Sequence, residues 1–357
     1  MTTPPNTSLD SSHAATFIIA EAGVNHNGDL ALAEKLVDAA ADAGADAVKF
    51  QTFKAAKLVT HAAKKAEYQI ANTKEEGTQF EMLKALELSE AHHHHLHRYA
   101  GTRGIMFLSS PFDIESMGLL ASLHMKIGKI PSGELTNLRF LQAMTRHFEE
   151  LILSTGMASL AEIQTALEVL TDAGARRERI TVLHCNTEYP TPMEDVNLRA
   201  MQTIRDATGC RVGYSDHSLG IEVPIAAVAL GAVTIEKHIT LDRELPGPDH
   251  RCSLEPDQLT QMVRGIRNIE QAMGNGVKVP SPSETKNIEI ARRSLHAATA
   301  LEAGHILREE DILARRPATG ISPMMLEQIL GKPITRAVPA HEPLTLDHIE
   351  AIPSEAP

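Results

Sequence analysis

Short apolar segments alternate with amphipathic ones along the first 275 residues, and this alternation constrains the fold more than any other feature of the sequence. Continuous apolar strands are typical of parallel sheets that are buried on both faces. The pattern predicts strands at 17–23, 47–52, 104–110, 125–131, 151–156, 180–186, 211–215 and 234–239. It predicts helices at 31–43, 87–100, 114–123, 160–173, 198–207, 223–230 and 256–273, and assigns none to 132–150.

Eight strand candidates within about 260 residues match the count and size of a TIM barrel. A doubly wound open sheet is the alternative, but it usually has five or six parallel strands and a glycine-rich fingerprint loop. No strong fingerprint loop follows any of these strands. The predicted fold class is therefore α/β, a TIM (β/α)8 barrel.

The alternation ends at Gly274–Asn287, which is rich in Gly, Pro and Ser and is typical of a linker. Beyond it the sequence predicts a small β-rich domain. The first residues lack the basic and apolar regions of a signal peptide, and we expect a flexible tail there. We divide the chain into a tail (1–16), a barrel (17–275), a linker (276–288) and a small domain (289–352). In that domain we expect strands at 295–300, 333–338 and 343–346 and a helix at 323–330.

Composition excludes several classes of function. The chain has 34 Lys and Arg against 46 Asp and Glu, a formal net charge of -12, whereas nucleic-acid and membrane-surface binders normally carry a basic excess. Aromatic residues make up 3% with no Trp, which argues against a base-stacking platform. Three scattered cysteines favour a reducing compartment, and no apolar run is long enough to span a bilayer. We expect a cytoplasmic protein without nucleic-acid or membrane partners.

Every predicted strand ends in polar residues, and TIM barrels build their active sites at the carboxyl ends of their strands. A barrel that served packing alone would not need polar groups at all eight ends. These residues include Glu21; Lys49 and Gln51; Ser109 and Ser110; Lys129, Ser132 and Glu134; Ser154; His184, Thr187 and Tyr189; Ser215, Asp216 and His217; and Glu236, Lys237 and His238.

Lys49 and Lys129 lie on apolar strands, where an unpaired ammonium group is costly to bury. They predict an anionic ligand or carboxylate partners. Serine hydroxyls can donate hydrogen bonds to phosphate or carboxylate oxygens, and four of them follow these strands. They are Ser110, Ser132, Ser154 and Ser215.

Glu21 and Glu134 are candidates for acid–base chemistry or for orienting a polar substrate. Salt bridges to the two lysines are the alternative, and the two interpretations are compatible. His217 and His238 end adjacent strands, so their rings can converge on a divalent metal such as Mn²⁺. Two hydrogen-bonded core histidines are the alternative here.

His93 and His97 have an i, i+4 spacing that can bind zinc. They lie in a polar helical segment, 90–100, away from the strand ends. We therefore expect a solvated helix face rather than a metal site.

Several segments, in this order, resemble the sialic acid synthases, and the resemblance covers about residues 17 to 350. The C-terminal stretch RRPATGISPM (315–324) is similar to that family's small antifreeze-like, or SAF, domain. The barrel segments are IIAEAGVNHNGD (18–29), AVKFQTFKAAKL (47–58), KIPSGELTNL (129–138), STGM (154–157), HCNTEYPTPMEDVNL (184–198), GYSDHSLG (213–220), IEKHITLD (235–242) and PGPDH (246–250).

The resemblance implies an enzyme that condenses phosphoenolpyruvate with an N-acetylated hexosamine and releases phosphate by C–O cleavage. The expected activity is N-acetylneuraminate synthase, acting on N-acetylmannosamine. The alternative is N,N'-diacetyllegionaminate synthase, acting on 2,4-diacetamido-2,4,6-trideoxymannose. The resemblance also implies a divalent metal, Mn²⁺ or Mg²⁺, and a domain-swapped homodimer in which each SAF domain caps the partner's barrel.

Position within the matched motifs implies a role for each candidate residue. Glu21 and Glu134, with Lys49 and Lys129, are implied to be catalytic, and His217 and His238 to hold the metal. Thr187 departs from the family pattern, because some relatives have Asn at this position. Phosphoenolpyruvate contacts are implied for Lys49, Ser110, Lys129, Ser132, Ser154, Thr187 and Ser215, and sugar contacts for Gln51, Asn72, Tyr189, Asp249 and the neighbouring subunit's Arg316.

Overall fold

The computed structural model describes residues 15–73 and 77–350, and the chain forms two compact units, Met1–Gly274 and Asn275–Pro357. Most of the predicted tail therefore lies outside the described residues. Of that tail, only Ala15 and Thr16 are described.

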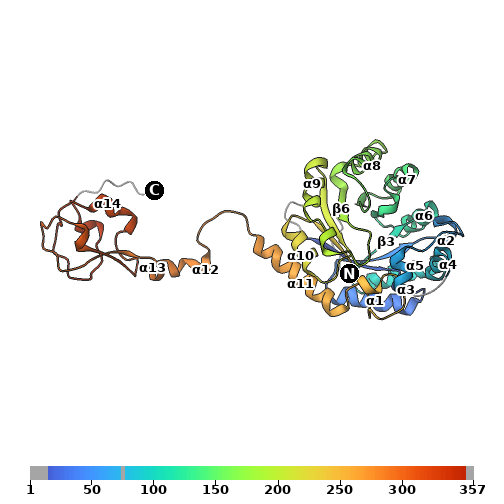
Figure 1. The fold of residues 1–357 in the computed structure, drawn as a ribbon, viewed down its shortest axis with the longest axis horizontal. Coiled ribbons are helices and arrows are strands. Elements are labelled where there is room, and N and C mark those ends of the chain that lie inside the picture. Colours follow the sequence, from blue (N-terminus) through green and yellow to red (C-terminus); the bar gives the residue numbers. More distant parts are fainter. Residues whose placement is uncertain (1–14, 74–76, 351–357) are drawn as a thin grey trace. The chain divides into compact units, whose positions relative to one another are not determined.

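Eight parallel strands form the centre of the first unit, in the order β3-β2-β1-β8-β7-β6-β5-β4 (Figure 1). β1 is hydrogen-bonded to both β2 and β8, and β3 lies beside β4, so the sheet comes near to closing on itself. The predicted TIM barrel is confirmed. The strands are β1 (Phe17–Gly23), β2 (Ala47–Thr52), β3 (Met106–Pro111), β4 (Ile127–Ile130), β5 (Glu150–Ser154), β6 (Ile180–Cys185), β7 (Arg211–Asp216) and β8 (Thr234–His238).

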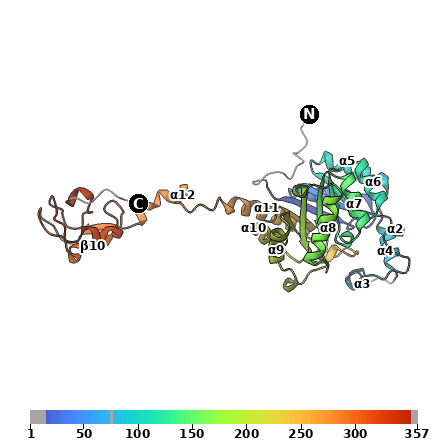
Figure 2. The same ribbon diagram turned by 90° about the horizontal axis from the view of Figure 1, so that it is seen from above.

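Helices surround the strands (Figures 1 and 2). Side chains cap several of them: Asp29, Ser89 and Ser159 each accept a hydrogen bond from a backbone N–H of the first turn. The ring consists of α1 (Leu30–Asp42), α5 (Glu90–Thr102), α6 (Ile114–Ser122), α7 (Leu138–His147), α8 (Leu160–Asp172), α9 (Arg199–Thr208), α10 (Glu222–Ala229) and α11 (Pro256–Met273). Between β2 and α5 lie three shorter helices, α2 (Ala55–Leu58), α3 (Glu67–Thr73) and α4 (Gln79–Leu86).

The helix α7 corrects the sequence analysis, which assigned no helix to 132–150. Its buried residues are Phe140, Leu141 and Met144, a stripe little more than one turn long among polar residues. Asn137 caps the helix by accepting a hydrogen bond from the Phe140 N–H (3.3 Å). Leu138, Leu141 and Met144, with Phe140, recur at helical spacing, so the sequence does contain a helical signal between β4 and β5.

The second unit contains a small antiparallel sheet, in which the predicted strand 295–300 corresponds to β9 (Ser294–Ala297), but the other predicted strands differ from the observed ones. β9 pairs antiparallel with β10 (Ile312–Arg315), which was not predicted. The predicted strands at 333–338 and 343–346 make only isolated bridges among the described residues. Pro333 and Pro343 lie in those bridges and lack the N–H that a continuous ladder needs. The remaining helices are α12 (Pro282–Thr285), α13 (Asn287–Ala291) and α14 (Leu326–Ile329).

Neither described part of the chain contains a helix with the length and apolar character needed to cross a membrane.

Each unit buries its own hydrophobic core, and Ile329 is fully buried in that of the second unit. We expect Ile329→Ala to remove about 2–5 kcal/mol from the stability of this unit, because the cavity it leaves is poorly filled. Scanning calorimetry should show the second unit's transition moving to lower temperature while the barrel's transition stays in place. Ile290→Ala, at a position that is 69% exposed, is the control and should move neither. One transition that shifts as a whole would contradict independent cores.

Candidate functional site

A cavity of about 660 Å³ opens at the carboxyl ends of the barrel strands, and all eight strands contribute a side chain to its wall. This is the end at which the sequence analysis placed the active site. The predicted residues that line it are Glu21, Lys49, Gln51, Ser110, Lys129, Ser132, Ser154, Thr187, Tyr189, Ser215, His217 and His238.

Two lysines and two glutamates form the floor of this cavity. Lys49 Nζ lies 2.7 Å from Glu21 Oε2 and 3.6 Å from Glu236 Oε2. Lys129 Nζ lies 3.6 Å from the other oxygen of Glu236, Oε1. Glu236 therefore bridges the two ammonium groups, a role that the sequence analysis did not assign to it. Its signal was available, because it lies two residues before His238 on β8 and so faces the same side of the strand.

Burial and charge act against each other in this floor. Burial raises the pKa of Glu21 to about 7, although Lys49 opposes the shift. Burial would also raise the pKa of Glu236, but the charges of Lys129 and Lys49 hold it below its ordinary value. Burial lowers the pKa of Lys129. The empty floor is thus close to neutral, and it gains positive charge when Glu21 takes up a proton.

Serine hydroxyls surround the floor and are oriented by it. Ser110 Oγ accepts a hydrogen bond from Lys49 Nζ (3.1 Å), and Ser154 Oγ accepts one from Lys129 Nζ (2.7 Å). Because these two hydroxyls accept from the lysines, their own protons are free to donate to an anion in the cavity. Ser215 Oγ instead donates to Glu236 Oε1 (3.0 Å). The lysines and serines together suit a ligand with phosphate or carboxylate oxygens.

His217 and His238 lie side by side in the wall, with ring centroids 5.3 Å apart. His217 Nδ1 is 2.5 Å from the Asn186 carbonyl oxygen, so this nitrogen carries the proton and Nε2 keeps its lone pair. Burial lowers the pKa of His217 to about 4 and that of His238 well below its ordinary value, which keeps both rings neutral. Nδ1 of His238 is buried without a hydrogen-bond partner.

Two neutral imidazoles with an unsatisfied ring nitrogen fit a divalent transition metal. Asp249 lies nearby, with Oδ2 4.0 Å from His238 Nδ1. Within the described residues, however, no three or more His, Cys, Asp or Glu side chains form a ready metal cluster. A metal held by His217 and His238 would therefore keep positions open for water or substrate.

Aromatic rings form the wall next to the histidines. Tyr189 stacks on His217 with centroids 4.0 Å apart and on Tyr68 with centroids 5.1 Å apart. Tyr68 and its neighbour Gln69 belong to α3 and also line the cavity. The sequence analysis did not find them, because α3 follows no strand end and its only signal was the rarity of tyrosine, with four in the chain.

Four predicted residues do not line the cavity. Glu134 accepts a hydrogen bond from Asn137 Nδ2 (2.7 Å), and Asn72 Nδ2 donates to the Pro248 carbonyl (2.7 Å). Asp249 is buried, which raises its pKa to about 7. Arg316 belongs to the second unit, and its part in the site stays a prediction.

His93 corrects the expectation of a solvated histidine face on α5. It is 1% exposed, with Nε2 2.8 Å from Thr52 Oγ1 and Nδ1 2.9 Å from the Ser89 carbonyl oxygen. Thr52 and Ser109 also share a hydrogen bond (2.6 Å), so polar side chains on the outer faces of β2 and β3 bury this ring. Sequence periodicity could not reveal that, because it does not show which strand residues face a helix.

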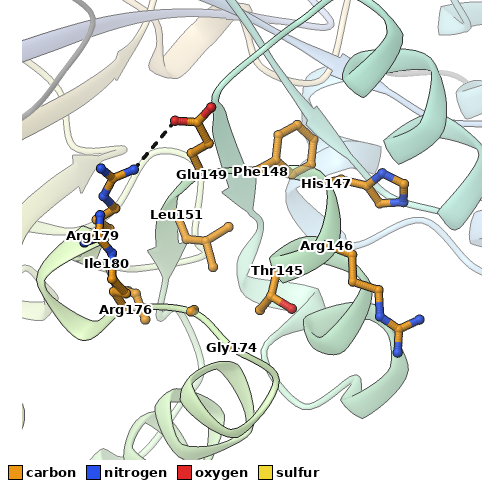
Figure 3. A pocket seen from close by; sticks show the side chains of 11 residues that line it. Thr145, Arg146, His147, Phe148, Glu149, Leu151, Gly174, Arg176, Arg179 and Ile180 are labelled. Atoms are coloured by element: carbon orange, nitrogen blue, oxygen red, sulfur yellow. Dashed lines mark ion pairs between the residues drawn. The ribbon is translucent and has the colours of Figure 1, made fainter.

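A second cavity, of about 320 Å³, lies at the opposite end of the strands, where β5 and β6 begin (Figure 3). Arg179 pairs with Glu149 (3.6 Å). Figure 3 shows Arg146 and His147 directed away from that pair. The cationic groups do not converge, and this end of a TIM barrel normally serves stability.

Comparison with known proteins gives matches for both units. Residues 36–278 match the NeuB family, and residues 292–350 match the SAF domain. The N,N'-diacetyllegionaminic acid synthase of Campylobacter jejuni is 53% identical over 90% of this chain and 96% of its own. The N,N'-diacetyllegionaminic acid synthase of Legionella pneumophila is 47% identical over 95% of this chain and 96% of its own. The crystal structure of an N-acetylneuraminic acid synthetase from Leptospira borgpetersenii has a TM-score of 0.67 and 37% identity, covering 78% of this chain and 91% of that one.

Glu236→Gln tests the charge balance of the floor. The substitution leaves Lys129 without the carboxylate that lies 3.6 Å from it, so we expect a loss of about 3 kcal/mol in unfolding free energy. Urea denaturation measures the loss. Glu168→Gln, at an exposed position of α8, is the matched control and should change stability by less than about 0.5 kcal/mol. Equal stability of the two variants would show that Glu236 does not neutralise the lysines.

Proposed function

Because the chain belongs to the NeuB family, we propose that it is an N,N'-diacetyllegionaminate synthase. It is an enzyme of the phosphoenolpyruvate-dependent nonulosonic acid synthase type. The relatives described as N,N'-diacetyllegionaminic acid synthases are 53% and 47% identical, against 37% for the N-acetylneuraminic acid synthetase. These identities favour the activity that the sequence analysis named second over the N-acetylneuraminate synthase it named first.

The observation that carries the proposal is the floor of lysines and glutamates with its surrounding serines, which come from the carboxyl ends of seven of the eight strands. Phosphoenolpyruvate carries a phosphate and a carboxylate, and Lys49 and Lys129 are the buried cations that can meet them. Ser110 and Ser154 supply the hydroxyl protons. Ser132, Thr187 and Ser215 complete the wall on which we place this substrate.

In the proposed reaction, C3 of phosphoenolpyruvate attacks the aldehyde carbon of the open-chain sugar and forms a C–C bond. Water adds to C2, and the tetrahedral intermediate expels inorganic phosphate by breaking the C2–O bond. Glu21, with its pKa near 7, is placed beside Lys49 to take the proton of that water. We assign Glu134 a lesser part in proton transfer, because its carboxylate is turned toward Asn137.

We propose that His217 and His238 hold a divalent metal, Mn²⁺ or alternatively Mg²⁺. When bound, such an ion supplies Lewis acidity that polarises the sugar carbonyl. Tyr189 stacks on His217 and contacts the ring of His238, so we place the sugar's reacting end beside these three rings. Gln51, Asn72 and Asp249 are the polar groups we assign to the sugar.

The two tyrosines in the cavity wall also support the assignment of 2,4-diacetamido-2,4,6-trideoxymannose as the sugar. Tyr68 and Tyr189 present stacked rings to the cavity, and Met157 at its edge is 75% exposed. Compared with N-acetylmannosamine, the trideoxy sugar carries a methyl group at C6 and a second acetamido methyl. Both groups gain from contact with an apolar surface.

We further propose a homodimer in which the partner's SAF domain delivers its Arg316 to the sugar, and a cytoplasmic location. Cys185, Cys210 and Cys252 are all buried and free, as in proteins of reducing compartments.

Phosphate release from phosphoenolpyruvate in the presence of Mn²⁺ tests the proposed activity. We expect 2,4-diacetamido-2,4,6-trideoxymannose to give a kcat/KM at least about tenfold above that of N-acetylmannosamine, the discrimination that one or two apolar contacts provide. Mass spectrometry of the product confirms the nonulosonic acid. A preference for N-acetylmannosamine would refute the sugar assignment and leave the reaction type intact. No phosphate release with either sugar would refute the reaction.

Subunit mixing tests the swapped homodimer. Lys129→Met and Arg316→Ala should each abolish turnover alone. If Arg316 acts on the partner's barrel, a heterodimer of the two variants has one intact site, and random exchange restores about a quarter of the wild-type activity. A mixture that stays inactive after denaturation and refolding together, under conditions that restore the wild type, would contradict the swap.

A further inference from the structure

Two three-residue segments lie side by side at the ends of β7 and β8. Ser215-Asp216-His217 lies next to Glu236-Lys237-His238, and the parallel register pairs Ser215 with Glu236 and Asp216 with Lys237. Successive residues of a strand face opposite sides, and the first and third residues of both segments line the cavity. Asp216 and Lys237 therefore point away from the cavity, toward the helix layer.

Behind the histidines these two residues form a completely buried ion pair. Lys237 Nζ lies 2.6 Å from Asp216 Oδ2, and both side chains are 0% exposed. Lys237 Nζ also donates to the backbone carbonyl of Ser218. The other carboxylate oxygen of Asp216 accepts hydrogen bonds from the Ser218 N–H (3.0 Å) and hydroxyl (2.7 Å). The pair thus ties β8 to the residues on either side of His217.

The strand ladder between β7 and β8 reaches Asp216 and Lys237 but does not extend to the histidines. Its register between β7 and β8 runs through Tyr214, Ser215 and Asp216 and stops before His217. Beyond Asp216, the backbone carbonyl of His217 accepts a hydrogen bond from the Thr191 N–H (2.9 Å) instead of from β8. The carbonyl of His238 likewise accepts from the Leu254 N–H (2.8 Å). The Asp216–Lys237 pair is the link nearest to both histidines that joins their two segments directly.

A buried ion pair is a poor means of stabilising a fold, because desolvation offsets most of the attraction, and an apolar pair of similar size often does as well. A role in fixing the geometry of the two neighbouring histidines explains this pair better. We propose that Asp216 and Lys237 are positioning residues that set the separation of His217 and His238, and thereby the affinity for the divalent metal. The inference rests on the metal site proposed above.

Removing both charges at once separates positioning from stability. The double variant Asp216→Leu/Lys237→Met leaves no buried charge unpaired and removes only the hydrogen bonds to Ser218, so it should stay folded and unfold at a moderately lower urea concentration than the wild type. We expect its Kd for Mn²⁺, measured by electron paramagnetic resonance on the full chain without substrates, to rise about 10–100-fold, as for other groups that orient metal ligands. His217→Ala in the same titration marks the loss of the site.

The pair Asp46–Arg267 is the control. It is an ion pair of similar length (2.8 Å) that is only partly buried, and its aspartate precedes β2 at the amino end of the strands. Asp46→Leu/Arg267→Met should leave the Kd for Mn²⁺ unchanged.

The outcomes separate this inference from the proposed function. Wild-type Mn²⁺ affinity in the folded double variant would overturn the positioning role and leave the metal site standing. Wild-type protein that binds no more Mn²⁺ than His217→Ala would overturn both. If the double variant does not fold, Asp216→Asn/Lys237→Met makes the same test, because it leaves no charge unpaired and keeps one oxygen for Ser218. Its Kd should then rise at least about threefold, and an unchanged Kd would overturn the positioning role.

Discussion

The mutual neutralisation of two lysines and two glutamates at the floor of the barrel is the interaction on which the site depends. Strands that are buried on both faces offer no water to an ionised group, so Lys49 and Lys129 are tolerable only beside Glu21 and Glu236. The same balance keeps the floor ready for an anion, because Glu236 spans both ammonium groups and leaves two serine hydroxyls free to donate. Packing and ligand recognition thus rest on one set of contacts.

Residues two positions apart on a strand face the same side, and the closed barrel brings such residues from neighbouring strands together around the cavity. Lys49 and Gln51 lie on β2, Ser215 and His217 at the end of β7, and Glu236 and His238 on β8, each pair facing the cavity. The residues between them face the other side: Asp216 and Lys237 pair with each other, and Phe50 packs in the hydrophobic core. Each strand end therefore has two functional faces, one that meets a ligand and one that holds the strand in place.

Most of this arrangement could be predicted, because polar residues at the ends of apolar runs are conspicuous and a closed barrel brings all strand ends together. The bridging role of Glu236 could not, since it depends on distances between side chains of three strands. Tyr68 lies in a segment that only tertiary packing brings to the cavity. The apolar residues of α7 do follow a helical period, so that helix could have been predicted, whereas the strand pattern at 333–338 and 343–346 gives only isolated bridges.

The burial of His93 shows what a repetitive stretch can conceal. Four consecutive histidines, 92–95, look interchangeable, yet only His93 among them is enclosed, with its ring nitrogens satisfied by Thr52 and Ser89. Its replacement by an apolar residue would remove the buried hydrogen bonds to Thr52 and to the Ser89 carbonyl, whereas its neighbours are partly exposed. Among these four histidines the enclosed ring of His93 is therefore the one most constrained by packing, so a run of low complexity contains a fixed point of the fold.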